Sequence, residues 1–153
     1  MLRTKSEAQA FLESYELYAV QIECKLEERQ QWHDLALSIT GQMGGDRVQT
    51  SGSKDKMAQA VERCVMVEEE ILKQVDRLAA KQKEVIQALE KLDNPTEYKL
   101  LHLRYIQFKE LKVIADIFNS SYDWATTTHG RALKSLQDIL DVQNVQRNKC
   151  DFV

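Results

Sequence analysis

Hydrophobic side chains recur every three or four residues over the first part of the chain. Between residues 7 and 39 this spacing places aromatic and aliphatic side chains on a single helical stripe. We therefore expect a first long helix over about 7–39. The stripe consists of Phe11, Tyr15, Tyr18, Ile22, Leu26, Trp32 and Leu35.

A more regular pattern follows between residues 54 and 92, where mainly apolar positions alternate at spacings of four and three over five heptads. This repeat predicts a coiled-coil seam formed by Met57, Val61, Cys64, Glu68, Ile71, Val75, Leu78, Gln82, Val85, Leu89 and Leu92. At about 1.5 Å per residue, the helix would be on the order of 55 to 60 Å long and would need a partner helix. The first helix is the expected partner, in an antiparallel hairpin, and self-association through the same stripe is the alternative.

Two short segments interrupt the helical pattern. Residues 40–53 contain four of the five glycines among small polar residues, which predicts a flexible connector. Farther along, Asn94 is expected to cap a helix that starts with Pro95, and Glu97 is placed to complete a capping box. These segments predict a helical hairpin over 1–93 and a new domain from residue 94.

Three shorter helices are expected after this boundary, at about 95–107, 110–118 and 121–140. The last two have the spacing of a helix-turn-helix unit, in which small residues lie at the helix crossing and a turn residue tolerates left-handed dihedrals. Ala115, Asn119 and Ala125 stand at these offsets, and Ser121 is placed to cap the second helix. Ile114, Phe118 and Leu133 are expected to add apolar contacts.

Composition supports an all-α fold, because the 153 residues include a single proline and are rich in helix-forming residues. The net charge of −3 excludes a strongly basic nucleic-acid binder, so any DNA contact must come from a local patch. Three widely spaced cysteines, an odd number, argue against a disulfide framework. No apolar run fits a signal peptide or a bilayer span, so we expect a cytoplasmic protein without a membrane partner.

Catalytic motifs are not found in the sequence. It contains no glycine-rich phosphate loop and no nucleophile elbow, so we expect neither an enzyme nor a small-molecule substrate or cofactor. His33, His102 and His129 lack metal-ligand spacing. His129 precedes Gly130, interpreted as a helix-packing glycine, and is expected to be structural, as are Arg104 and Tyr105.

The run SYDWATTTHGRALKSL resembles the second helix of a sigma-70 region 4 helix-turn-helix. More broadly, residues 53–136, with LRYIQFK, IADIFNSSYDW and HGRAL, resemble the ArpU and RinA class of phage late-gene transcription regulators of Gram-positive bacteria. The resemblance covers a little over half of the chain. It implies sequence-specific binding to phage promoter or operator DNA and joint action with the host RNA polymerase.

By this resemblance, the DNA-facing side chains of the recognition helix are Tyr122, Asp123, Thr126 and Thr127, with Trp124 and Ala125 turned partly inward. Hydroxyl and carboxylate groups of this kind can hydrogen-bond to base edges. Nearby cations supply the expected phosphate contacts, which are Lys109, Lys112, Arg131 and Lys134. Related helices usually carry more arginine where this chain has Asp123 and Thr126, which weakens the expected affinity for DNA.

The resulting prediction is a transcription regulator with a hairpin over 1–93, a DNA-binding domain over 94–140 and a tail over 141–153. A homodimer would place two recognition helices on neighbouring half-sites. One alternative is a DNA-recognition subunit similar to a phage small terminase. The other is an adaptor that binds polymerase or another regulator and makes little contact with DNA.

Overall fold

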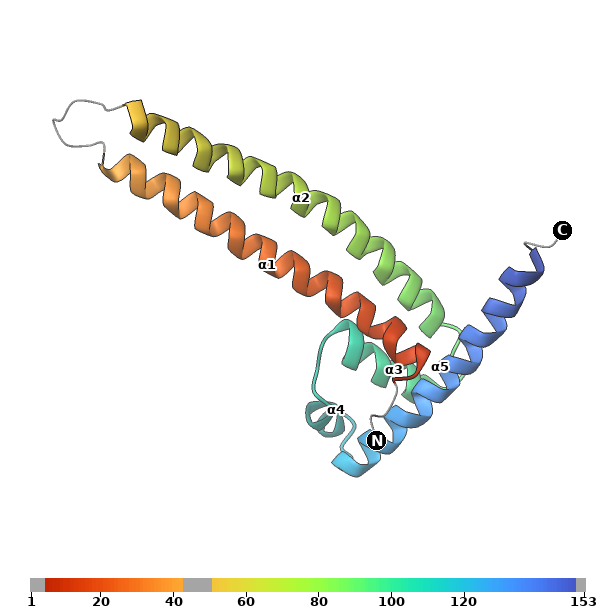
Figure 1. Cartoon of the computed structure of the whole chain (residues 1–153). Coiled ribbons are helices and arrows are strands. Elements are labelled where there is room, and N and C mark those ends of the chain that lie inside the picture. Colours follow the sequence, from red (N-terminus) through yellow and green to blue (C-terminus); the bar gives the residue numbers. More distant parts are fainter. Residues whose placement is uncertain (1–4, 43–50, 151–153) are drawn as a thin grey trace. The chain divides into compact units, whose positions relative to one another are not determined.

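The computed structural model describes residues 5–42 and 51–150, which form helices joined by short turns and contain no strand. The elements are α1 (Glu7–Gln42), α2 (Ser51–Leu89), α3 (Pro95–Leu101), a π-helix η1 (His102–Ile106), α4 (Leu111–Ile117) and α5 (Tyr122–Cys150) (Figure 1). The predicted all-α class is confirmed. None of the described helices is both long enough and apolar enough to cross a membrane.

Residue contacts divide the chain into two compact units. Unit 1 comprises residues 1–17 and 79–153, and unit 2 comprises residues 18–78. The long helices α1 and α2 contribute to both units. The start of α1 and the end of α2 therefore belong with the C-terminal helices, an association that the hydrophobic pattern did not predict.

Polar contacts join α1 and α2 within unit 2. Lys25 Nζ lies 2.7 Å from the Glu70 carboxylate, and Arg29 Nε lies 2.8 Å from that of Glu68. The Arg63 guanidinium lies over the Trp32 ring, 5.7 Å from its centroid. The predicted pairing of the two long helices is thus confirmed, and Glu68 has the polar role in the hairpin that its seam position suggested.

The predicted seam of α2 is wrong at Val61 and Val75, two of its seven positions in unit 2. Val61 and Val75 are 46% and 43% exposed, whereas Ala60 and Val67 are 1% and 3% exposed. The inward positions alternate at spacings of three and four as Met57, Ala60, Cys64, Val67, Ile71, Gln74 and Leu78. The prediction favoured apolar side chains next to these positions, Val61 beside Ala60 and Val75 beside Gln74.

The corresponding stripe on α1 also differs from the prediction. Leu26 and Leu35 are 46% and 45% exposed, although both were expected to face the partner helix. Tyr15 is buried, and Phe11, Tyr18, Ile22 and Trp32 are half-buried. Because the apolar residues of α1 are irregularly spaced, the sequence did not show where the stripe turns away from α2.

The core of unit 1 lies among α3, α4 and α5 and the adjoining parts of the long helices. Leu100, Ile114 and Leu136 are completely buried, as are Leu12 of α1 and Leu89 of α2. Burial of side chains of this size contributes roughly 1.5 to 3 kcal/mol each. This core fixes α4 against α5.

Two predicted helix starts are confirmed by their caps. Asn94 Oδ1 accepts a hydrogen bond from the Thr96 amide at 2.9 Å, and Pro95 takes the first helical turn. Ser121 Oγ accepts one from the Trp124 amide at 3.1 Å. These bonds satisfy backbone donors that a helix start leaves unpaired.

Several predicted boundaries need correction. Residues 40–42 and 51–53 are helical, so the predicted connector over 40–53 is too long, and its remainder lies outside the described residues. The predicted helix over 95–107 changes to a π-helix at His102. The last helix runs to Cys150 instead of ending at 140, so residues 141–150 of the expected tail are helical, and 151–153 lie outside the described residues.

Candidate nucleic-acid interface

Helices α4 and α5 are held together through small side chains and a tight turn. Ala115 and Ala125 are 3% and 0% exposed, as the predicted helix crossing requires. Asn119 adopts a left-handed conformation with φ of 51°, which a non-glycine residue takes only in special turns. The Ser120 amide donates to the Ala115 carbonyl at 2.9 Å and closes the turn. The predicted burial of the two alanines and the left-handed turn at Asn119 are confirmed.

One side of the first half of α5 faces solvent. At 100° per residue, residues 122, 123, 126, 127, 130, 131 and 134 fall within about half of the helix circumference. All seven are exposed, whereas Ala125, Thr128 and Ala132 on the opposite side are buried. The four residues expected to contact bases and two of the expected phosphate contacts therefore share one accessible surface. We call this surface the α5 face; it comprises Tyr122, Asp123, Thr126, Thr127, Gly130, Arg131 and Lys134.

The side chains at the start of α5 differ in what they offer a ligand. Thr126 Oγ1 donates back to its own helix, to the carbonyls of Tyr122 at 2.9 Å and Asp123 at 3.0 Å. Thr127 is exposed, and its hydroxyl makes no hydrogen bond within the described part of the chain. Trp124 is half-buried against Phe118, with ring centroids 5.1 Å apart. The hydroxyl of Thr127 is therefore the more available hydrogen-bonding group.

The cations expected to contact phosphate are not equally accessible. Lys112, Arg131 and Lys134 are exposed, whereas Lys109 is half-buried. The Lys109 carbonyl accepts a hydrogen bond from Arg104 Nη1 at 3.1 Å, which anchors its backbone next to Phe108, a residue with φ of 56°. Residues 95–140 contain six Lys and Arg and five Asp and Glu, so the local basic surplus is one charge.

Gly130 lies within the α5 face and not at a helix contact. An added Cβ would meet no atom within 4 Å, so the interpretation as a packing glycine is wrong. Glycine inside a helix costs about 1 kcal/mol relative to alanine. No contact among the described residues requires a glycine at this position. A ligand that approaches the α5 backbone closely would benefit from it, because no side chain would stand between the ligand and the backbone.

Behind this face, His129 has a structural role, as expected. Its Nε2 shares a hydrogen bond of 2.8 Å with the hydroxyl of Tyr105, and the two rings stack with centroids 5.8 Å apart. Burial lowers the pKa of His129, with a further decrease from the Arg104 charge, and burial raises the pKa of Tyr105 to about 12. The neutral pair braces α5 against η1.

Two open clefts border α5 within unit 1. One, of about 740 Å³, lies between the start of α1 and the α5 face, and its lining includes Lys5, Gly130, Leu133 and Lys134. Leu133, expected in the helix-crossing core, is half-buried at this cleft.

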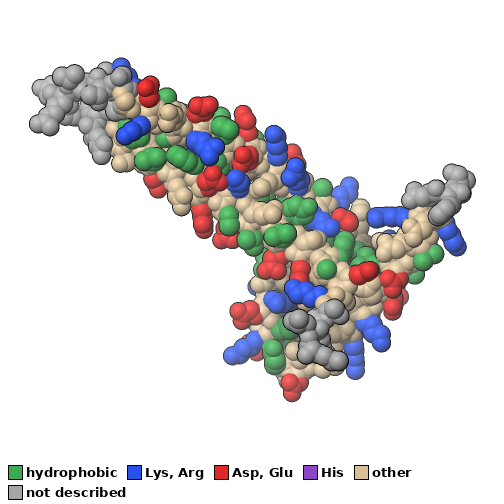
Figure 2. Space-filling view, in the orientation of Figure 1, with side chains coloured by type: hydrophobic (Ala, Val, Ile, Leu, Met, Phe, Trp, Pro, Cys, Tyr) green, Lys and Arg blue, Asp and Glu red, His purple; other side chains and the backbone are tan. Residues whose placement is uncertain are grey.

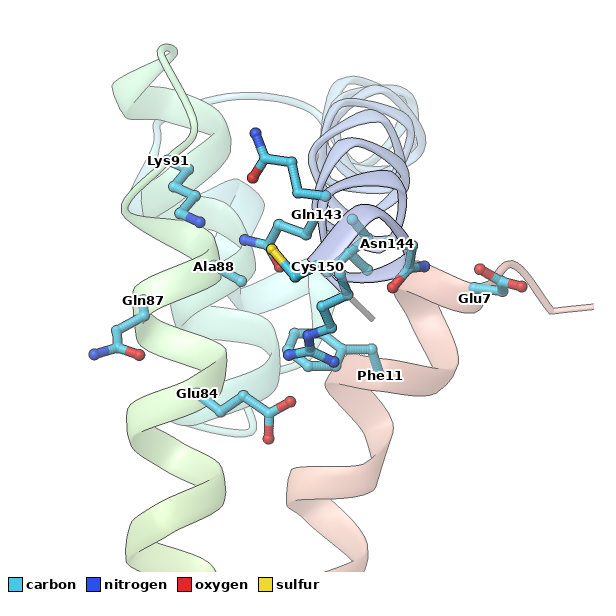
Figure 3. A pocket seen from close by; sticks show the side chains of 12 residues that line it. Glu7, Phe11, Glu84, Gln87, Ala88, Lys91, Gln143, Asn144 and Cys150 are labelled. Carbon is cyan, nitrogen blue, oxygen red and sulfur yellow. The ribbon is translucent and has the colours of Figure 1, made fainter. Parts of the chain in front are cut away.

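The other cleft, of about 630 Å³, lies between the last turns of α2 and the end of α5 (Figure 3). Amide side chains such as Gln87 and Gln143 line it, together with Phe11 and Cys150 (Figure 3). Its charged lining residues include both carboxylates and cations, Glu7 and Glu84 with Lys91 and Arg147, so the lining favours neither an anion nor a cation.

Metal-binding clusters of three or more His, Cys, Asp or Glu side chains do not occur among the described residues. Comparisons with protein-family models, curated proteins and solved structures gave no match.

Proposed function

We propose that this protein is a sequence-specific DNA-binding transcription regulator and that the α5 face contacts the DNA. The observation that carries the proposal is the arrangement of α4 and α5. Two helices joined by a tight left-handed turn present the first half of α5 to solvent, with Thr127 uncovered and Gly130 leaving space above the backbone. A helix exposed in this way has the dimensions to enter the major groove.

Base recognition and phosphate binding fall to different side chains in this proposal. Thr127 donates or accepts a hydrogen bond at a base edge, and Asp123 accepts one from a cytosine amino group. Lys112, Arg131 and Lys134 bind phosphates and supply affinity that does not depend on sequence. Tyr122, 55% exposed, reaches a phosphate or stacks at the edge of the contact.

The resemblance to ArpU and RinA regulators supports the biological part of the proposal. It favours control of phage or prophage late genes together with the host RNA polymerase, in the cytoplasm of a bacterial cell. A homodimer would present two α5 faces to two half-sites, about one helical turn apart or a multiple of it.

A pair of substitutions tests this assignment. Thr127→Ala is expected to reduce affinity for the selected site by roughly 1 to 3 kcal/mol and to leave random DNA unaffected. Lys112→Ala is expected to weaken binding to all sequences alike and to reduce the salt dependence. Fluorescence anisotropy with specific and random duplexes measures both. Equal losses on both duplexes for Thr127→Ala would reject its role in base recognition.

An adaptor that binds another protein is the second candidate. It is favoured by the hydrophobic side chains that reach the surface between charged ones along the long helices (Figure 2). A steep decrease in DNA affinity with rising salt separates the two functions, because phosphate contacts release counterions and protein contacts of this kind do not. The small-terminase alternative predicts a ring-sized oligomer, which sedimentation analysis would detect.

A further inference from the structure

The outer surface of α2 in unit 2 carries a second hydrophobic stripe that no part of the described chain covers. Val61, Val65, Leu72 and Val75 are 46%, 48%, 67% and 43% exposed. Their spacings of four, seven and three place them within an arc of about 80° on the helix. The gap of seven contains Glu68, which belongs to the same stripe and is paired with Arg29 at 2.8 Å. We call these five residues the outer seam.

The outer seam has the heptad spacing of a coiled-coil contact and lies beside the inward-facing seam that contacts α1. A helix with two adjacent seams of this kind can contact two helices at once. The hairpin supplies one of them. The position of the second is open to solvent.

The first helix continues the hydrophobic surface on the same side of the hairpin. Leu26 and Leu37 are 46% and 58% exposed. By helical periodicity they lie on one side of Arg29, whereas Lys25 and Trp32 lie on the other side. Since Lys25 and Trp32 contact Glu70 and Arg63, Leu26 and Leu37 lie on the side of α1 that is next to the outer seam.

A row of carboxylates runs along the outer seam at intervals of seven residues. It consists of Asp55, Glu62, Glu69 and Asp76, all exposed. On the helix circumference, the row lies about 80° from the centre of the outer seam. This is the flanking position of a coiled coil, at which charged side chains select the partner. Among the α2 cations in unit 2, three lie on the opposite side of the helix by the same periodicity, namely Lys56, Arg63 and Arg77. Lys73 lies at the far edge of the row, and Lys54, seven residues before Val61, lies in line with the start of the outer seam.

The distribution of charge between the two units follows the same trend. Unit 2 contains eight Lys and Arg and eleven Asp and Glu, and unit 1 contains thirteen of each. The whole net charge of −3 therefore belongs to unit 2. An acidic hairpin is poorly suited to DNA and well suited to a cationic protein surface.

We propose that the outer seam binds an amphipathic helix of another protein, whose apolar stripe is flanked by lysine or arginine. The apolar stripes bury one another, and the basic flank pairs with the carboxylate row. A second copy of this chain fits less well, because antiparallel outer seams would bring two carboxylate rows together. This inference does not depend on DNA binding.

The probes are two synthetic peptides of about three heptads with leucine at the core positions. One carries lysine at the flanking positions and the other carries glutamate. Fluorescence anisotropy with the full chain should show binding of the lysine peptide and at least about tenfold weaker binding of the glutamate peptide, with the difference decreasing at high salt.

Matched variants locate the site. Leu72→Ser should weaken the lysine peptide by about tenfold or more, since this side chain is 67% exposed and contributes little to the fold. Met66→Ser, on the side of Trp32 and Arg63, is the control and should change binding by less than about twofold. The triple variant E62Q, E69Q and D76N should bind the lysine peptide about tenfold more weakly than the unchanged protein does. It should bind the glutamate peptide at least as tightly as the unchanged protein does.

Three results would overturn the proposal. The first is equal binding of both peptides, which would remove the charge selection. The second is no binding of the lysine peptide at millimolar concentration while circular dichroism shows a folded chain. The third is self-association that Leu72→Ser abolishes in sedimentation equilibrium, which would make a second copy the occupant.

Discussion

Replacement of Gly130 by alanine separates the demands of folding from those of binding. Gly130 lies inside α5, is exposed, and would place a Cβ in open space. Alanine is about 1 kcal/mol more favourable than glycine in a helix interior. A smaller conformational entropy of the unfolded chain is part of this difference. No steric cost opposes the gain, so we expect the free energy of unfolding to rise by about 1 kcal/mol.

Urea and thermal denaturation followed by circular dichroism at the helix band measure this change. For a chain of this size, a gain of about 1 kcal/mol raises the thermal midpoint by roughly 2 to 4 °C. A lower midpoint for Gly130→Ala would refute the reasoning, because it would mean that the added methyl group meets an atom of the fold.

The same variant is informative for function. If DNA lies against the α5 face, the added methyl group stands between α5 and the DNA and weakens binding, although the protein is more stable. Asn144→Ala, an exposed and uncharged substitution ten residues after Lys134 in α5, is the control for changes in helix propensity. Unchanged DNA affinity for Gly130→Ala would remove this glycine from the proposed contact.

Two further predictions concern the structural support of the α5 face. Ala125→Leu inserts a large side chain at a helix crossing where Ala125 is 0% exposed, and it should lower the free energy of unfolding by about 1 to 3 kcal/mol. The control is Val142→Leu, at a 58% exposed position, which should change the free energy of unfolding by less than about 0.5 kcal/mol. Urea denaturation measures both. Because burial lowers the pKa of His129, the unfolded chain binds the proton more readily, so stability should be complete above about pH 6.5 and fall as the pH decreases below it. His129→Gln should reduce this acid-side slope in denaturation series; an unchanged slope would contradict the assignment.

Local sequence signals were sufficient to predict the caps and the turn of the C-terminal helices. Asn94, Asn119 and Ser121 act through their own or adjacent backbone, so the caps and the left-handed turn follow from residue type and position. The buried alanines at the helix crossing followed from their spacing relative to that turn. The exposed residues at the start of α5 were expected from the family resemblance and not from local signals.

The remaining features depend on contacts between distant residues. In α2, the apolar repeat fits two neighbouring stripes, and only the position of α1 shows that Ala60 and Val67 face inward while Val61 and Val75 do not. The π-helix at His102 was not indicated by spacing, and neither was the Tyr105–His129 hydrogen bond, which joins residues 24 positions apart. Gly130 seemed to be a packing residue because sequence does not reveal what lies next to a helix.

Selection of random duplex DNA by the purified full chain is the most direct test of the central claim. The selection is followed by binding of the enriched sequence across a salt series, with Thr127→Ala in parallel. We expect enrichment of one half-site or a two-fold motif, an affinity that falls as salt rises, and a loss of preference in the variant. No enriched sequence at low salt, or binding that is independent of salt, would contradict the claim that α5 contacts DNA.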